Sequence, residues 1–183
     1  KALQRGQTLF WGTQNQLRRV DQVIREEAAN DAEIYVYDGT GQRARKIRST
    51  VTSKRTLTHE TRYLPGLEIR TSPKETLHVI SVQAGHCRVQ VLHWEQVRSA
   101  DKPPDQHCYN LLDHLGSSSL ELDGDGGLIS QESYYPYGAT AWWAGADRIQ
   151  ASYRTFRYSG QERDATGLYY FGRRYYIPWR QRW

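Results

Sequence analysis

Apolar and polar residues alternate along most of this 183-residue chain, with a period close to two. The clearest case is the pair of runs at 77–82 and 87–94, where β-branched residues alternate with polar ones on both sides of the turn-rich residues 83–86. Such alternation is typical of an antiparallel strand with one wet face. The two runs therefore predict a hairpin.

The same pattern predicts strands along the rest of the chain. They are expected at 9–11 and 17–20 (one hairpin), 33–37, 42–49, 52–64, 67–70, 108–112, 119–122, 128–134, 153–158, 168–171 and 173–177. Residues 21–32 are polar and Glu-rich, which favours a short helix or an exposed loop, and 139–149 predict an irregular excursion. Helical periodicity is weak everywhere, so the fold class is mainly β, antiparallel, with short helices only.

A tyrosine followed by a turn with Asp and Gly recurs along the chain. It begins at Tyr37, and variants follow at 122–138 and 164–170. Asp38-Gly39 suits a tight hairpin because this dipeptide tolerates positive φ. A recurring strand–turn–strand unit indicates a repeat architecture, in which each unit buries its apolar face against its neighbours. This favours a scaffold or container over a compact enzyme with a pocket.

Composition changes this picture little. Hydrophobic residues make up 38% of the chain, but 13 Tyr and 6 Trp supply large half-buried surfaces. Methionine is absent, which predicts an internal piece of a longer chain. We find no signal-peptide pattern and no apolar run of about 18 residues, so direct membrane insertion is not expected.

The net charge of +5 has its excess near the end, at Arg173, Arg174, Arg180 and Arg182. A solvated or partner-facing terminus explains it. Nucleic-acid binding through Arg and aromatic residues is the alternative. No recognition helix or RNA-binding signature accompanies the charge, so we expect no nucleic acid.

Cysteine and histidine form two dipeptides, at 86–87 and 107–108. A zinc site is disfavoured because adjacent strand residues point to opposite faces. Cys87 and Cys108 are expected as inert thiols, with a disulfide as the alternative. The loop that begins at Asp123 superficially resembles a calcium loop, but Tyr134 stands where the acidic twelfth ligand is needed. We therefore expect no metal and no cofactor.

Several motifs resemble one family. They are DHLGSS at 113–118, YYPYG at 134–138, YSGQERDATGLYY at 158–170, YDGTGQR at 37–43, RYLPGLE at 62–68 and LHWE at 92–95. The first three resemble the RHS-repeat-associated core, and YDGTGQR resembles a YD repeat. The remaining two are similar to the variant in the C component of bacterial insecticidal Tc toxin complexes.

The resemblance implies two domains, 1–100 with YD-repeat shell strands and 107–183 with the RHS-repeat-associated core. In that family the C component and its B partner wind a β-strand spiral into a hollow shell around a cytotoxic C-terminal effector. A pore-forming A component then translocates the effector. The resemblance thus implies a secreted bacterial virulence complex whose partners are the B component, its own effector as cargo and, indirectly, the A component.

The same resemblance implies that the core is an aspartyl autoprotease that releases the effector. It assigns an assisting role to Arg174, within GRRYYIPW at 172–179. Its two catalytic aspartates match nothing here, because Asp123, Asp125 and Asp164 stand in turn positions. This segment is therefore expected to be no enzyme itself. There are two alternatives to a purely structural role. In the first, the segment is part of the autoprotease core. In the second, it is a glycan-binding YD-repeat module that stacks sugars on its tyrosines.

An isolated slice of such a sheet would carry unpaired strand edges. We expect the 183-residue protein to be sticky or dimeric in isolation.

Overall fold

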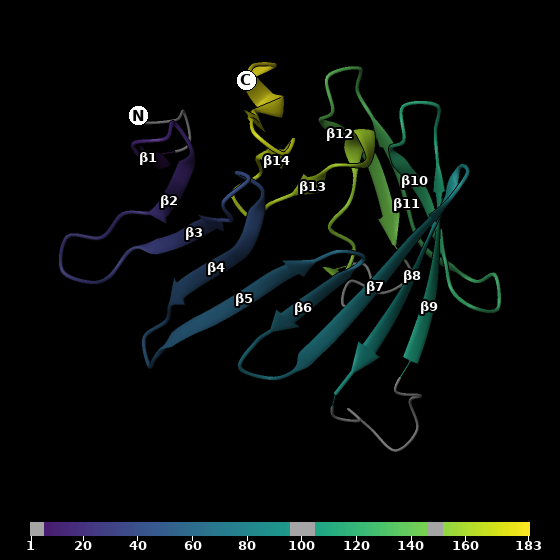
Figure 1. Cartoon of the computed structure of the whole chain (residues 1–183), viewed down its shortest axis with the longest axis horizontal. Helices are drawn as coiled ribbons and strands as arrows, with labels where there is room; N and C mark the ends of the chain where they lie inside the picture. The colour runs from purple at the N-terminus through teal and green to yellow at the C-terminus, as the bar shows by residue number, and fades with distance from the viewer. Residues whose placement is uncertain (1–5, 96–104, 146–151) are drawn as a thin grey trace. The chain divides into compact units, whose positions relative to one another are not determined.

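A computed structural model describes residues 6–95, 105–145 and 152–183 (Figure 1). The chain divides into two compact units, Lys1–His78 and Val79–Trp183. Nearly all regular structure in both is antiparallel strand, which confirms the predicted fold class. Among the described residues, no helix has the length and apolar character needed to cross a membrane.

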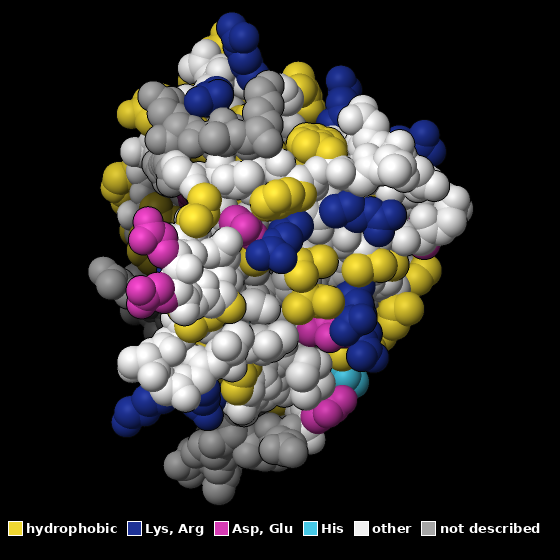
Figure 2. All heavy atoms as spheres, turned by 90° about the vertical axis from the view of Figure 1, so that its left-hand side faces the viewer, with side chains coloured by type: hydrophobic (Ala, Val, Ile, Leu, Met, Phe, Trp, Pro, Cys, Tyr) yellow, Lys and Arg dark blue, Asp and Glu magenta, His cyan; other side chains and the backbone are white. Residues whose placement is uncertain are grey.

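The first unit is a sheet whose strands pair in chain order. It contains β1 (Thr8–Trp11), β2 (Leu17–Val23), β3 (Asp31–Tyr37), β4 (Arg43–Val51), β5 (Thr56–Leu64), β6 (Leu67–Thr71) and the start of β7 (Thr76–Ala84). Each of β1 to β5 pairs antiparallel with the strand that follows it. Leu17, Val20 and Tyr35 are buried, so these strands bury one face. Figure 2 shows one surface of the protein, on which Lys and Arg side chains are interspersed with acidic and apolar ones.

The second unit continues the meander and adds a small second sheet. The rest of β7 is followed by β8 (Cys87–Trp94), β9 (Asp105–Leu112), β10 (Ser118–Leu122), β11 (Leu128–Tyr134) and β12 (Thr140–Gly145). The small sheet contains β13 (Glu162–Arg163), β14 (Tyr169–Tyr170) and β15 (Tyr175–Tyr176). Two 3-10 turns, η1 (Tyr158–Gly160) and η2 (Pro178–Arg180), are the short helices.

One turn geometry recurs at Asp38, Asp113, Asp123 and Asp164. In each, the Asp amide donates to the carbonyl four residues on, and the amide of a glycine three residues on donates back to the Asp carbonyl. At the first three turns, Asp Oδ1 also accepts amide hydrogens from residues two and four positions on. Aspartate thus satisfies the turn amides with its own side chain.

The glycine that needs positive φ is the one three residues after Asp. In the first turn this is Gly41, with φ +83°. The expectation for Asp38-Gly39 was wrong in this detail, because the turn is longer than a two-residue hairpin and Gly39 does not adopt positive φ. Asp therefore holds the start of the turn, and the later glycine reverses the chain.

Two strand predictions were wrong. Residues 140–145, within the expected excursion at 139–149, form β12, because they pair with β11 even though their own pattern does not alternate. The strand expected at 153–158 is reduced to a single bridge, Phe156 to Glu162. Residues 24–30, by contrast, form no strand or helix, in line with the loop alternative for 21–32.

The domain boundary expected near 101–106 falls mostly outside the described residues. The compact units meet between His78 and Val79, inside β7. That division follows packing rather than motif content, so the boundary between shell strands and core stays a prediction.

Candidate functional site

Residues 152–163 run across the buried side of β10 to β12 with little regular structure of their own. The Ser118 amide donates to the Arg157 carbonyl at 3.1 Å, and the Ser159 amide donates to the Ser117 hydroxyl at 3.0 Å. The Arg88 guanidinium lies 4.3 Å from the centre of the Phe156 ring. Side chains and isolated hydrogen bonds, rather than a strand ladder, hold this segment.

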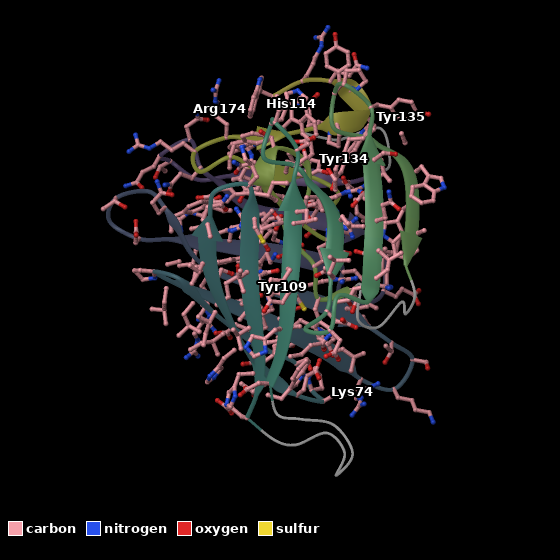
Figure 3. All side chains as sticks on the ribbon, turned by 90° about the vertical axis from the view of Figure 1, so that its right-hand side faces the viewer. Lys74, Tyr109, His114, Tyr134, Tyr135 and Arg174 are labelled. Carbon is pink, nitrogen blue, oxygen red and sulfur yellow. The ribbon has the colours of Figure 1, made fainter. Side chains whose placement is uncertain are left out.

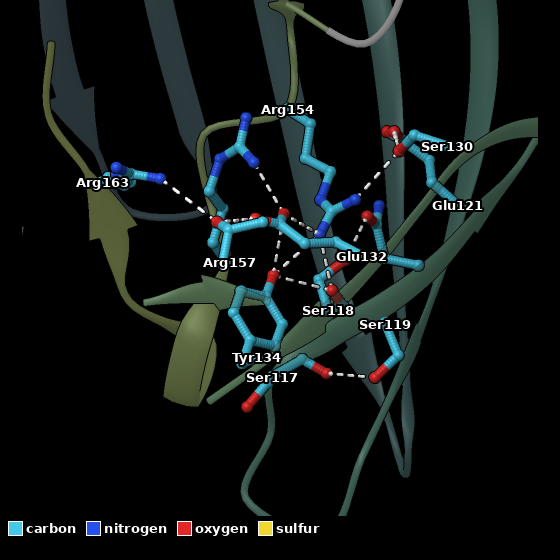
Figure 4. A network of polar contacts seen from close by, with 12 residues as sticks. Ser117, Ser118, Ser119, Glu121, Ser130, Glu132, Tyr134, Arg154, Arg157 and Arg163 are labelled. Atoms are coloured by element: carbon cyan, nitrogen blue, oxygen red, sulfur yellow. Dashed lines mark hydrogen bonds and ion pairs between the residues drawn. The ribbon is translucent and has the colours of Figure 1, made fainter. Parts of the chain in front are cut away.

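Glu132 is at the centre of the polar contacts between this segment and the sheet (Figure 4). Its carboxylate is 0% exposed and accepts from Arg154 Nη2 at 2.8 Å and from Arg157 Nη1 at 2.6 Å, both at Oε2. The Tyr134 hydroxyl also donates to Oε2, at 3.1 Å, and the Thr140 hydroxyl donates to Oε1 at 2.5 Å. One buried anion therefore ties two cations of the segment to β11 and β12.

Arg154 is the most deeply buried cation of this network, with its side chain 1% exposed. Besides Glu132, Nη2 donates to the Ser118 carbonyl at 2.5 Å and to the Tyr134 hydroxyl at 2.8 Å. Nη1 donates to the Ser130 hydroxyl at 2.9 Å. The planar fork of an arginine suits this geometry, because its donors point in fixed directions towards several acceptors.

A second buried carboxylate lies next to this network. Glu121 accepts a hydrogen bond from the Ser130 hydroxyl at 2.9 Å. Burial raises the Glu121 pKa, and the Ser130 hydrogen bond together with the charges of Arg154 and Arg157 opposes that rise. Burial likewise raises the Tyr134 pKa, so its hydroxyl keeps its proton and can donate to Glu132.

Three tyrosine hydroxyls hold the loop formed by residues 136–138. Tyr158 donates to the carbonyl of residue 136 at 2.8 Å, Tyr176 to that of 137 at 3.0 Å, and Tyr169 to that of 138 at 3.2 Å. A Cβ at Gly138, where φ is +80°, would lie 2.6 Å from the Tyr158 ring. The motifs at 134–138 and 158–170 thus describe two sides of one packed arrangement.

Arg174 lies directly before β15 and is exposed. Its guanidinium carbon is 4.5 Å from the centre of the Trp183 ring, and its carbonyl accepts from the Phe171 amide at 2.8 Å. It makes no ion pair with any residue of 6–95, 105–145 or 152–183. Figure 3 shows Arg174 towards the same end of the second unit as His114 and Tyr135.

The turn aspartates stay in turns, as expected. Asp123 accepts the amide hydrogens of Asp125 and Gly127, and Asp164 closes its turn through backbone bonds. Both cysteines are free: Cys87 pairs in register with Leu111, and Cys108 with Gln90, so no disulfide joins them. The described residues contain no group of three or more His, Cys, Asp or Glu that could hold a metal ion.

Sequence reasoning did not single out Glu132, Arg154 or Arg157. One signal was available, since alternation places Glu132 on the same face of β11 as Ser130 and Tyr134, and Ser130 and Glu132 are buried there. A carboxylate at such a position needs a partner. Which arginine supplies it could not be read from the sequence, because 22 residues separate Glu132 from Arg154.

These features define a class of protein: a repeat protein built as an antiparallel meander with Asp-and-Gly turns, to which a C-terminal arginine- and tyrosine-rich segment is tied. No family model matches the chain. Two curated proteins of Yersinia entomophaga are similar to it. Toxin subunit YenC2 is 49% identical over 189 residues, which cover 100% of this chain and 20% of that protein. Toxin subunit YenC1 is 45% identical over 184 residues, which cover 97% of this chain and 19% of that protein.

Solved structures agree. A crystal structure of TcdB2-TccC3 matches with a TM-score of 0.93 and 47% identity over 100% of this chain and 9% of that one. The Photorhabdus luminescens Tc holotoxin pore with TccC3-D651A matches with a TM-score of 0.91 and 48% identity over 97% of this chain and 8% of that one. The chain belongs to the RHS-repeat proteins of the TccC type found in Tc toxins. It spans about one fifth of the length of the two curated relatives.

Proposed function

We propose that this chain is a segment of the shell that a Tc toxin C subunit builds with its B subunit around a C-terminal cytotoxic effector. The observation that carries the proposal is the match over 100% of the chain to TcdB2-TccC3, at a TM-score of 0.93. Strands that pair in chain order support it, because such a sheet extends without a closed core of its own. The proposal includes export in a toxin complex and an indirect partnership with the A component.

Protease protection tests the shell role. The C subunit containing this segment, co-expressed with its B subunit, is treated with a protease, and the effector region is followed by immunoblot. An enclosed effector survives at protease levels that destroy the same effector expressed alone. Equal digestion rates, with the B–C complex intact by size-exclusion chromatography, would refute the proposal.

We propose as a second role that the core takes part in self-cleavage, with Arg174 assisting a pair of aspartates outside these 183 residues. Its exposed position in the turn between β14 and β15, beside the Trp183 ring, supports this role. A nearby guanidinium can stabilise an ionised carboxylate or a developing oxyanion. The 183 residues alone are not expected to cleave themselves.

Substitution in the C subunit tests this second role. Arg174→Ala is expected to abolish self-cleavage while the complex still assembles. Arg180→Ala, at another exposed arginine in the same terminal stretch, is the matched control and should cleave normally. Undiminished cleavage in Arg174→Ala would remove Arg174 from the mechanism.

A further inference from the structure

We infer that Arg154 is a positioning residue for self-cleavage: it fixes residues 152–163 on β10 and β11 and thereby sets the place of the small sheet that carries Arg174. This inference rests on the proposed self-cleavage role. The evidence for it is geometric and follows the chain from the buried network to Arg174.

The segment has no strand ladder of its own to locate it. Between residues 152 and 161 the regular structure is η1 and the single bridge from Phe156 to Glu162. Inside η1, Ser159 even takes a left-handed conformation, with φ 52°. The place of such a segment is set by the side chains that anchor it.

Arg154 is the strongest of these anchors. Its four hydrogen bonds reach the Ser118 carbonyl on β10 and the Ser130, Glu132 and Tyr134 side chains on β11, all in a site where the arginine side chain is 1% exposed. Arg157 contributes one bond to Glu132 and is 22% exposed. Charged hydrogen bonds strengthen when water is excluded, so Arg154 should dominate.

Strand pairing links the residues that Arg154 anchors to the hairpin that contains Arg174. Residues 154–161 lead into β13, where Arg163 pairs with Tyr169 on β14. On the other side of β14, Tyr170 pairs with Tyr175, the residue after Arg174. A shift of the segment therefore moves the hairpin that presents Arg174, whereas β10 and β11 keep their own ladder.

The tyrosine hydroxyls are a second tie, and they limit how far the hairpin can move. Tyr169 and Tyr176 donate to carbonyls of the loop at 136–138 from β14 and β15 themselves. Loss of Arg154 should therefore misplace Arg174 by a small distance rather than release it. A misplacement of about 1 Å is enough to slow a reaction roughly 100-fold.

The test uses the full C subunit with its B subunit and compares Arg154→Met, Arg154→Lys and Arg157→Met. Arg180→Met is the control for the same change at an exposed position. We expect self-cleavage to slow roughly 100-fold in Arg154→Met, with smaller losses in Arg157→Met and in Arg154→Lys, which keeps the charge but not the fork. Arg180→Met should cleave at the wild-type rate.

Hydrogen exchange supplies a readout that a general loss of stability would not give. In Arg154→Met, amides of residues 169–176 should exchange faster, while those of β10 and β11 stay protected. Wild-type cleavage in Arg154→Met, or equal loss of protection in β10, β11 and 169–176, would overturn the inference. If Arg174→Ala cleaves normally, the proposed self-cleavage role fails instead, and the exchange pattern alone decides whether Arg154 positions the hairpin.

Discussion

Replacing Glu132 with glutamine would expose the energetic role of the buried network. The substitution keeps the shape of the side chain but removes the only carboxylate that both Arg154 and Arg157 contact in the described structure. Breaking a buried ion pair by removing one partner costs about 3–5 kcal/mol, because the other charge stays buried. The glutamine oxygen still accepts one of the hydrogen bonds, which places the loss at about 3 kcal/mol.

The chain contains a matched control in its first unit. Glu60 also binds two arginines, Arg45 at 2.7 Å and Arg62 at 2.6 Å, but these arginine side chains are 43% and 64% exposed. Solvent-exposed pairs contribute about 0–1 kcal/mol. Glu60→Gln should therefore cost far less than Glu132→Gln, although each carboxylate binds two arginines.

Urea unfolding followed by circular dichroism would measure both variants. With a slope of about 2 kcal/mol per molar urea, a loss of 3 kcal/mol lowers the midpoint by about 1.5 M, and a loss below 1 kcal/mol lowers it by less than about 0.5 M. The slope should not change. If Glu132→Gln and Glu60→Gln shift the midpoint equally, or if Glu132→Gln costs less than about 1 kcal/mol, burial does not give the network its strength.

Three further predictions follow from local structure. Gly126→Ala should cost about 1–2 kcal/mol in the same assay because φ is +82° there, whereas Gly124→Ala in the same turn, without positive φ, should cost little. Burial raises the Cys108 pKa to about 12, and Cys108 is buried whereas Cys87 is half-buried. A thiol reagent at neutral pH should therefore label Cys87 first and Cys108 only after unfolding. Equal labelling rates of the two cysteines in the native protein would contradict this. The hydrogen bond from Arg25 lowers the Asp31 pKa, so the ionised form of Asp31 stabilises the fold above the usual carboxyl range, and that stabilisation is lost as the pH falls through the lowered pKa. Asp31→Asn should therefore be less stable than wild type at pH 7, and the difference should narrow as the pH falls below the usual carboxyl range; a difference that does not narrow in acid would contradict this.

Alternation and turn chemistry predicted most of the strands because both act locally. The Asp-and-Gly turns and the runs at 77–82 and 87–94 fall where the structure has turns and strands. The strand at Thr140–Gly145 was missed because Trp142 and Trp143 are adjacent and break the alternation, and it is pairing with β11 that makes this segment a strand.

The candidate site was harder to predict for the same physical reason. Tyrosine hydroxyls that reach the loop at 136–138, and Arg154 that reaches Glu132, are contacts between residues more than 20 positions apart. No local preference encodes such a contact. Arg174 was found only because a family resemblance pointed to it, and its assisting role stays a prediction.

The order of the strands has a consequence for how such a sheet can change in evolution. Each strand in the described sheets pairs with its chain neighbours, and each Asp-and-Gly turn closes through bonds within five residues. Gain or loss of a complete hairpin preserves the direction and facing of every later strand, whereas gain of a single strand reverses them. A sheet built this way can be lengthened or shortened in two-strand steps without redesign of the strands that remain.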